Sequence, residues 1–152
     1  MKILINKKAP FFIADGIKKN KTIKNFKLKK YIGEKYIILF FFTLIKEFHL
    51  LNKLKYEFEI RNVKIIGISY FSYIKKKYKI ILINDKEKKI SFNYGIISPY
   101  KYNKAFFFID KKGIIRYFSI YNLKIKININ EILRIIDSWQ YKEKESKNYP
   151  II

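Results

Sequence analysis

The chain has 152 residues, a length that suits one domain able to bury a hydrophobic core without disulfide bonds. None of these residues is a cysteine, which excludes disulfide bonds, thiolate metal sites and thiol redox catalysis within this sequence. Lys and Arg outnumber Asp and Glu by 34 to 12 and give a formal net charge of +22, an excess that suggests binding to the phosphates of a nucleic acid.

The N-terminus and the longest apolar run argue against secretion and against a membrane segment. Lysines stand among the few apolar residues at the N-terminus, and no apolar core of the length found in signal peptides follows. The most apolar run, residues 36–45, has ten residues and a lysine on each side, whereas a helix needs about 20 apolar residues to span a bilayer. We therefore expect a cytoplasmic protein with no membrane partner.

Residues 36–69 have the pattern of a βαβ unit. Residues 36–42 form a continuous aromatic and β-branched run, which is typical of a central strand covered on both faces. The apolar residues that follow recur every three or four positions, which predicts one face of a helix. They are Leu44, Phe48, Leu51, Leu54 and Phe58. Residues 63–69 then predict a second strand, parallel to the first.

A hairpin is predicted further along the chain. Residues 80–83 predict a short strand, and a short helix is expected near residues 87–92. Residues 106–110 and 114–121 then flank Lys111-Lys112-Gly113, a turn whose glycine can adopt a positive φ. This pattern predicts two antiparallel strands.

The chain ends with one more predicted helix. Asn128 or Asn130 can cap it. Its inner face is predicted to carry Ile129, Ile132, Leu133, Ile136 and Trp139. We expect one domain over residues 1–141 and a polar, mobile tail over residues 142–152. The order of elements predicts an α/β, thioredoxin-like fold with a central mixed β-sheet flanked by helices.

Several short motifs occur in one order along the chain. They are Ala-Pro-Phe-Phe at 9–12, Gly-Ile-Ser at 67–69, Tyr-Gly-Ile at 94–96, Lys-Ala-Phe-Phe-Phe-Ile-Asp-Lys-Lys-Gly-Ile-Ile-Arg at 104–116 and Ile-Asn-Glu-Ile-Leu-Arg at 129–134. In this order they resemble the typical 2-Cys peroxiredoxins of the AhpC/TSA family, whose hairpin usually reads Arg-Gly-Leu-Phe-Ile-Ile-Asp-x-x-Gly-x-x-Arg.

The resemblance implies the family's activity, which is the thioredoxin-dependent reduction of hydrogen peroxide and alkyl hydroperoxides in antioxidant defence. It also implies a homodimer or a higher homo-oligomer. In the family, the central strand runs into Pro-x-x-x-Thr-x-x-Cys at the start of the next helix. There the helix N-terminus and an Arg lower the pKa of the cysteine, and its thiolate attacks the peroxide.

That motif is missing from this chain. The Pro position falls at Thr43, and counting straight on puts Glu47 at the Thr position and Leu50 at the Cys position. If the later part of the helix is aligned instead, several residues of the loop must be missing. In both alignments the proline, the threonine and the nucleophile are absent.

The supporting groups differ too. Lys104 stands where the family has the Arg beside the thiolate, and a lysine lacks the planar, bidentate fork of arginine. The family's second Arg falls at Lys126-Ile127, and its resolving Cys falls at Tyr149. Thr43, Lys104 and Tyr149 are therefore relics of a family site by position, and none of them is predicted to be catalytic.

Four other residues could carry chemistry, but each has a structural interpretation. The single histidine, His49, has no Cys or Ser partner placed for it, and Trp139 belongs to the apolar face of the last helix. Asp85 and Asp110 end strands, where aspartate commonly caps turns. No phosphate loop, His-Glu metal motif or paired-carboxylate spacing occurs, so neither a cofactor nor a metal is predicted.

Three hypotheses of function remain. The first is a degenerate peroxiredoxin that keeps the fold without thiol peroxidase activity. The second is peroxide consumption by a non-thiol route around Lys104. The third is a basic protein that binds nucleic acid non-specifically or serves in assembly on the same scaffold. Against the third, Lys, Ile, Asn, Phe and Tyr make up 102 of the 152 residues, and their A/T-rich codons explain the charge by biased composition alone.

Overall fold

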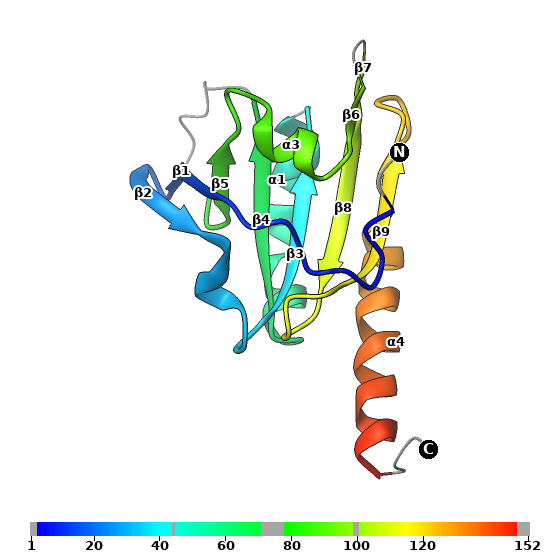
Figure 1. The fold of residues 1–152 in the computed structure, drawn as a ribbon. Helices are drawn as coiled ribbons and strands as arrows, with labels where there is room; N and C mark the ends of the chain where they lie inside the picture. The colour runs from blue at the N-terminus through cyan, green and yellow to red at the C-terminus, as the bar shows by residue number, and fades with distance from the viewer. Residues whose placement is uncertain (1–2, 44, 71–77, 99–100, 149–152) are drawn as a thin grey trace.

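A mixed seven-stranded sheet runs through the middle of the molecule in the order β2-β1-β5-β4-β3-β8-β9 (Figure 1). The computed structural model describes residues 3–43, 45–70, 78–98 and 101–148. The strands of this sheet are β1 Ile13–Lys18, β2 Lys21–Lys27, β3 Tyr36–Phe41, β4 Val63–Ser69, β5 Ile81–Asn84, β8 Lys104–Ile109 and β9 Ile115–Tyr121. The helices are η1 Leu28–Tyr31, α1 Ile45–Lys53, α2 Lys55–Glu59, α3 Lys89–Asn93 and α4 Ile129–Asn148. A separate two-stranded sheet pairs β6 Ile97–Ser98 with β7 Lys101–Tyr102.

The central strand is β3, and all six of its residues are buried. It runs parallel to β4, with Phe41 opposite Ile68, and antiparallel to β8, with Phe41 opposite Ala105. A strand buried on both faces needs an unbroken apolar sequence, and residues 36–42 provide one. The predictions of a central strand, a βαβ unit and a mixed sheet flanked by helices are confirmed.

Helical elements cover both faces of the sheet, and alternate residues of β3 point to each. Ile38 and Phe40 pack in a core with α1, α2 and α4. Leu39 and Phe41 pack in a second core with η1, α3 and the N-terminal segment. Figure 1 shows α3 in front of the sheet and α1 behind it. The two cores together hold β3 from both faces, and the candidate site lies at the C-terminal end of this strand.

The β8–β9 hairpin forms as predicted. Gly113 has a φ of +84°, and β8 and β9 pair antiparallel from Lys104 opposite Tyr121 onward. The carboxylate of Asp110 accepts hydrogen bonds from the backbone N–H of Lys112 and Ile114, which closes the turn. Asp110 therefore has the turn-capping role that its position at a strand end predicts.

An N-terminal hairpin was not predicted. The sequence pattern indicates no strand before residue 36, yet β1 and β2 pair there and β1 joins the sheet beside β5. Most residues of β2 are exposed, so its apolar signal is weak. Gly16 permits the contact with β5, because a Cβ at this position would lie 2.6 Å from the carbonyl oxygen of Leu82.

The helix after β3 is interrupted. A single helix over residues 44–58 was expected, but α1 ends at Lys53 and α2 begins at Lys55. Leu54, between them, has φ −96° and ψ +11°, outside the α-helical region. The apolar spacing survives this break, since Phe48, Leu51 and Phe58 are all buried in one core. Leu44 lies outside the described residues.

The last helix extends beyond residue 141 into the part predicted as a polar tail, while the division of the chain at residue 141 remains a prediction. Helix α4 continues through Asn148. Two contacts hold its second half: the Tyr36 hydroxyl donates to Glu143 at 3.0 Å, and the Gln140 amide donates to the carbonyl of Arg61 at 2.7 Å. At the start of α4, the Asn128 side chain accepts from the N–H of Glu131, which confirms Asn128 as the cap.

Among the described residues, no helix combines the length and the apolar character that crossing a bilayer requires. The cytoplasmic location remains a prediction.

Candidate functional site

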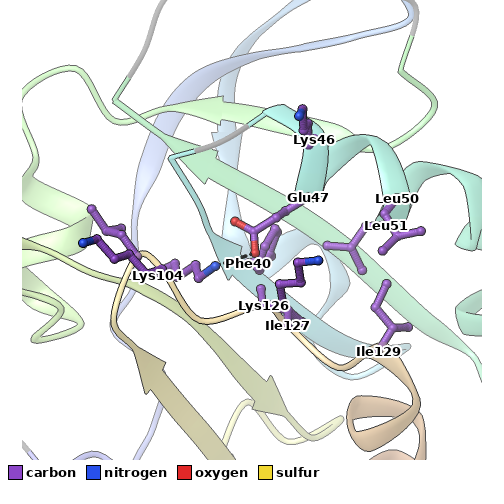
Figure 2. A pocket seen from close by; sticks show the side chains of 11 residues that line it. Phe40, Lys46, Glu47, Leu50, Leu51, Lys104, Lys126, Ile127 and Ile129 are labelled. Atoms are coloured by element: carbon purple, nitrogen blue, oxygen red, sulfur yellow. Dashed lines mark hydrogen bonds and ion pairs between the residues drawn. The ribbon is translucent and has the colours of Figure 1, made fainter.

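One pocket opens between α1 and the loop that precedes α4 (Figure 2). Its volume is about 590 Å³. It lies where β3 ends and β8 begins, which is the region where the carboxyl ends of parallel strands leave room for a ligand. Its apolar walls consist of Phe40, Leu50, Leu51, Leu123, Ile127 and Ile129. Its charged lining groups are Lys46, Glu47, Lys104, Lys124 and Lys126.

The first residue of β8 supplies a buried cation. Only 3% of the Lys104 side chain is exposed. Its Nζ donates to Oε2 of Glu47 at 2.8 Å. Figure 2 shows Glu47 extending from α1 into the pocket towards Lys104. Lys104, which stands at the position of the family's Arg, is thus paired with a carboxylate. This carboxylate comes from the helix that carries the reactive cysteine in the family that the sequence resembles.

The acidic partner comes from the first turn of α1. The Glu47 side chain is 16% exposed, and its second oxygen, Oε1, is buried without a hydrogen-bond partner in the described part of the chain. A pair with one unsatisfied oxygen does not recover the full free energy of removing both charges from water. This pair therefore contributes less to stability than its short distance suggests.

Aromatic packing fixes the position of α1 and so of Glu47. The ring of Phe48 stacks on Phe42, with 4.9 Å between their centroids, and meets Tyr78 edge-on. The Phe48 ring also lies against the backbone of β4 at Gly67, where a Cβ would be 2.4 Å from the ring. Glycine at this position lets α1 approach the sheet closely enough for Glu47 to reach Lys104.

A direct, largely buried ion pair between Lys104 and Glu47 dominates the electrostatics of the site. At 2.8 Å, two unit charges attract by about 6 kcal/mol at an effective dielectric constant near 20, and a desolvation penalty of several kcal/mol per ion opposes this. A protonated lysine has no lone pair, so Lys104 in this pair is no nucleophile. Carboxylate and ammonium together provide a fixed dipole and no redox group.

A tyrosine on β9 faces the same region. Tyr121 lies opposite Lys104 in the β8–β9 register. Burial raises the pKa of the Tyr121 phenol, and the negative charge of Glu47 adds a smaller rise. Tyr121 is therefore neutral at physiological pH.

The relic positions do not all meet in this pocket. Lys104 and Lys126 both line the pocket. The positions of the two arginines of the family that the sequence resembles therefore lie close together. Thr43 is half-buried just before α1 and is not among the lining residues. Tyr149 lies outside the described residues, as does the lysine run at 75–77.

The remaining candidates have structural roles or none. His49 is exposed, 6.2 Å from the Tyr78 ring between centroids. Asp85 accepts hydrogen bonds from the N–H of Ile90 and from the N–H and hydroxyl of Ser91, and so caps α3. No group of three or more His, Asp or Glu side chains suited to a metal occurs among the residues that the structure describes.

Sequence reasoning missed the pairing of Glu47 with Lys104. The two residues are 57 positions apart, and no local pattern links them. One signal was available: Glu47 is the only acidic residue between the central strand and residue 56, so it was the only acidic candidate from the segment that the family places beside the Lys104 position.

Comparisons with known proteins agree with the fold. The sequence model of the AhpC/TSA family matches residues 5–118. The 2-Cys peroxiredoxin BAS1, chloroplastic, of Hordeum vulgare is 34% identical over 169 aligned positions, which cover 97% of this chain and 80% of that protein.

Solved structures give the same result. The reduced 2-Cys peroxiredoxin of Plasmodium vivax superposes with a TM-score of 0.86 at 31% identity, covering 94% of this chain and 85% of that one. Prx1a of Plasmodium yoelii, described as forming an artefactual octamer when modified at its N-terminus, superposes with a TM-score of 0.78 at 27% identity, covering 95% and 94%.

Proposed function

The chain belongs to the AhpC/TSA family, and on that premise we propose that it keeps the scaffold of a peroxiredoxin but has lost thiol peroxidase activity. One observation supports this most strongly. The 152 residues contain no cysteine, and the cation at the relic position is already paired with Glu47. The Glu47 carboxylate thus supplies the negative charge beside the cation that a thiolate supplies in the family.

The paired lysine also speaks against a non-thiol route. Peroxide reduction requires a nucleophile that attacks one oxygen and releases the other. Lys104 is buried and paired, and Glu47 is a weak nucleophile held by the same contact. Neither group can accept an oxygen atom and later be regenerated by a thiol.

The same reasoning bears on partners. Thioredoxin reduces its targets by thiol–disulfide exchange, and this sequence offers it no disulfide. We therefore propose no thioredoxin partner. Self-association is still possible, because β9 is the last strand of the sheet. The N-terminal segment bonds to the backbone of Ile115 at the start of β9, and the outer side of the strand beyond Ile115 can pair with another strand. We propose a homo-oligomer on the basis of this strand edge and of the resemblance to the 2-Cys peroxiredoxins.

Coupled turnover tests the loss of activity. Purified protein is given hydrogen peroxide or tert-butyl hydroperoxide with thioredoxin, thioredoxin reductase and NADPH, beside a cysteine-containing 2-Cys peroxiredoxin as positive control. We expect NADPH oxidation at the rate of the protein-free blank. A rate above the blank would contradict the proposal, and its loss in Lys104→Met would assign it to this pocket.

Sedimentation velocity over a range of protein concentrations tests self-association. The proposal predicts a species larger than an 18.5 kDa monomer. The charge of +22 opposes association most strongly at low ionic strength, so the series includes added salt. A monomer at every concentration and salt level would refute the homo-oligomer and leave the proposed loss of activity untouched.

A further inference from the structure

We propose that the pocket between α1 and the loop before α4 binds an amphipathic organic anion, a carboxylate attached to an apolar chain. This goes beyond the loss of peroxidase activity, because it concerns what the pocket holds and requires no reaction. Three features of the described residues support it: the apolar walls, the lysines around the mouth and the neutral ion pair inside.

The walls suit an apolar chain. A volume of about 590 Å³ falls within the range of small-molecule sites, about 300–1,000 Å³. Phe40 and Leu51 are almost fully buried in the wall, whereas Leu50 and Leu123 keep 46% and 38% of their surface exposed. Apolar side chains in partial contact with water gain from a ligand chain that covers them.

The mouth suits a negative charge. Glu47 and Lys104 neutralise each other, so Lys46, Lys124 and Lys126 leave the lining with three net positive charges. All three lysines are exposed, and none forms an ion pair with the described residues. Figure 2 shows Lys46 and Lys126 among the residues around Glu47.

The ion pair fixes the orientation of the ligand. Glu47 would repel a second anion beside it, and Lys104 is already occupied by Glu47. The ligand carboxylate therefore lies at the mouth near Lys124 and Lys126, with its chain against the exposed parts of Leu50 and Leu123. A short anion without a chain would gain only the weak attraction of exposed lysines.

Isothermal titration calorimetry with decanoate, kept below its micelle-forming concentration, tests the proposal. Acetate supplies the charge without the chain, and decan-1-ol supplies the chain without the charge. We expect saturable binding of one decanoate per chain, no detectable acetate binding, and decan-1-ol binding weaker by about tenfold. Equal affinity for decanoate and decan-1-ol would overturn the role of the lysines.

Matched variants separate the pocket from the general positive charge. Lys124→Ala/Lys126→Ala removes two charges at the mouth and should weaken decanoate binding about tenfold. Lys24→Ala/Lys27→Ala removes two exposed charges on β2, at the opposite edge of the sheet, and should change the affinity by less than about twofold. Equal weakening by the two variants would refute a specific site. Leu50→Gln alters the partly exposed wall without disturbing the core and should also weaken binding.

A membrane lipid could present similar chemistry, so a second arm uses vesicles of phosphatidylglycerol. We expect free decanoate to bind without vesicles. Protein that sediments with vesicles but gives no saturable heat with decanoate would overturn the proposal in favour of a charged membrane-binding surface. The titration contains neither hydroperoxide nor thiol, so its outcome is independent of the peroxidase assay.

Discussion

Breaking the buried ion pair should reveal how strongly its two members depend on each other. In Glu47→Leu, the ammonium of Lys104, 3% exposed, loses its only charged partner in the described structure. Removing one partner of a buried pair costs about 3–5 kcal/mol. Lys104→Met should cost less, about 2–3 kcal/mol, because the Glu47 carboxylate is 16% exposed and can turn towards water.

The double variant Glu47→Leu/Lys104→Met should behave differently from the sum of its parts. Both replacements are apolar, similar in size and surrounded by Phe40, Leu51 and Ile129. We expect a free energy of unfolding within about 1 kcal/mol of the natural protein, which implies a coupling energy of about 5 kcal/mol. This approaches the attraction of about 6 kcal/mol obtained from the 2.8 Å separation.

The assay is equilibrium urea unfolding at pH 7, followed by circular dichroism, with equal m-values required across the four proteins. The control cycle uses Glu131→Leu and Arg134→Met on α4, a pair at 2.7 Å whose side chains are 43% and 65% exposed. Its coupling should be near zero, because water screens it. A Glu47/Lys104 double variant that loses the sum of the two single losses would refute the reasoning.

Three further predictions concern the fold and the charge. Burial, reinforced by repulsion from Lys18 and Lys55, lowers the pKa of Lys64 from 10.5 to about 8. Between pH 8 and 10.5 the unfolded chain therefore binds more protons than the folded chain, so the free energy of unfolding rises with pH in that window. Lys64→Met should stabilise the protein by about 1 kcal/mol at pH 7, and this gain should be lost above pH 10.5. A gain that persists at pH 11 would count against this explanation. Gly67→Ala should destabilise by about 1–3 kcal/mol in urea unfolding because its Cβ would meet the Phe48 ring at 2.4 Å, and an unchanged midpoint would show that α1 moves freely. Any binding of single-stranded DNA should weaken steeply as salt rises and show no sequence preference, and salt-independent binding in filter assays would disprove an electrostatic mechanism.

The parts of the fold that the sequence predicts depend on local signals. The unbroken apolar run of β3, the helical spacing of Phe48 and Phe58, and the positive φ at Gly113 all follow from residues near each other in the chain. The family's motifs lie on these same elements, so the resemblance and the pattern lead to one fold.

The missed features depend on contacts between distant residues. Helix α4 is held beyond residue 141 by the Tyr36–Glu143 hydrogen bond, which joins residues 107 positions apart. The hairpin of β1 and β2 is stabilised by packing beside β5, although most of its own surface is polar. Glu47 gains its role only when Phe48 docks on Gly67. No periodicity along the chain reports such contacts.

A single-turnover measurement tests the proposed loss of activity most directly, because it needs no reductant. The protein is mixed in molar excess with hydrogen peroxide, the remaining peroxide is measured over time, and the intact mass of the protein is recorded. We predict that peroxide disappears no faster than in buffer and that the mass of the protein is unchanged. Rapid loss of the peroxide, with one oxygen atom added to the protein for each peroxide consumed, would contradict the proposal and assign redox chemistry to a residue other than cysteine.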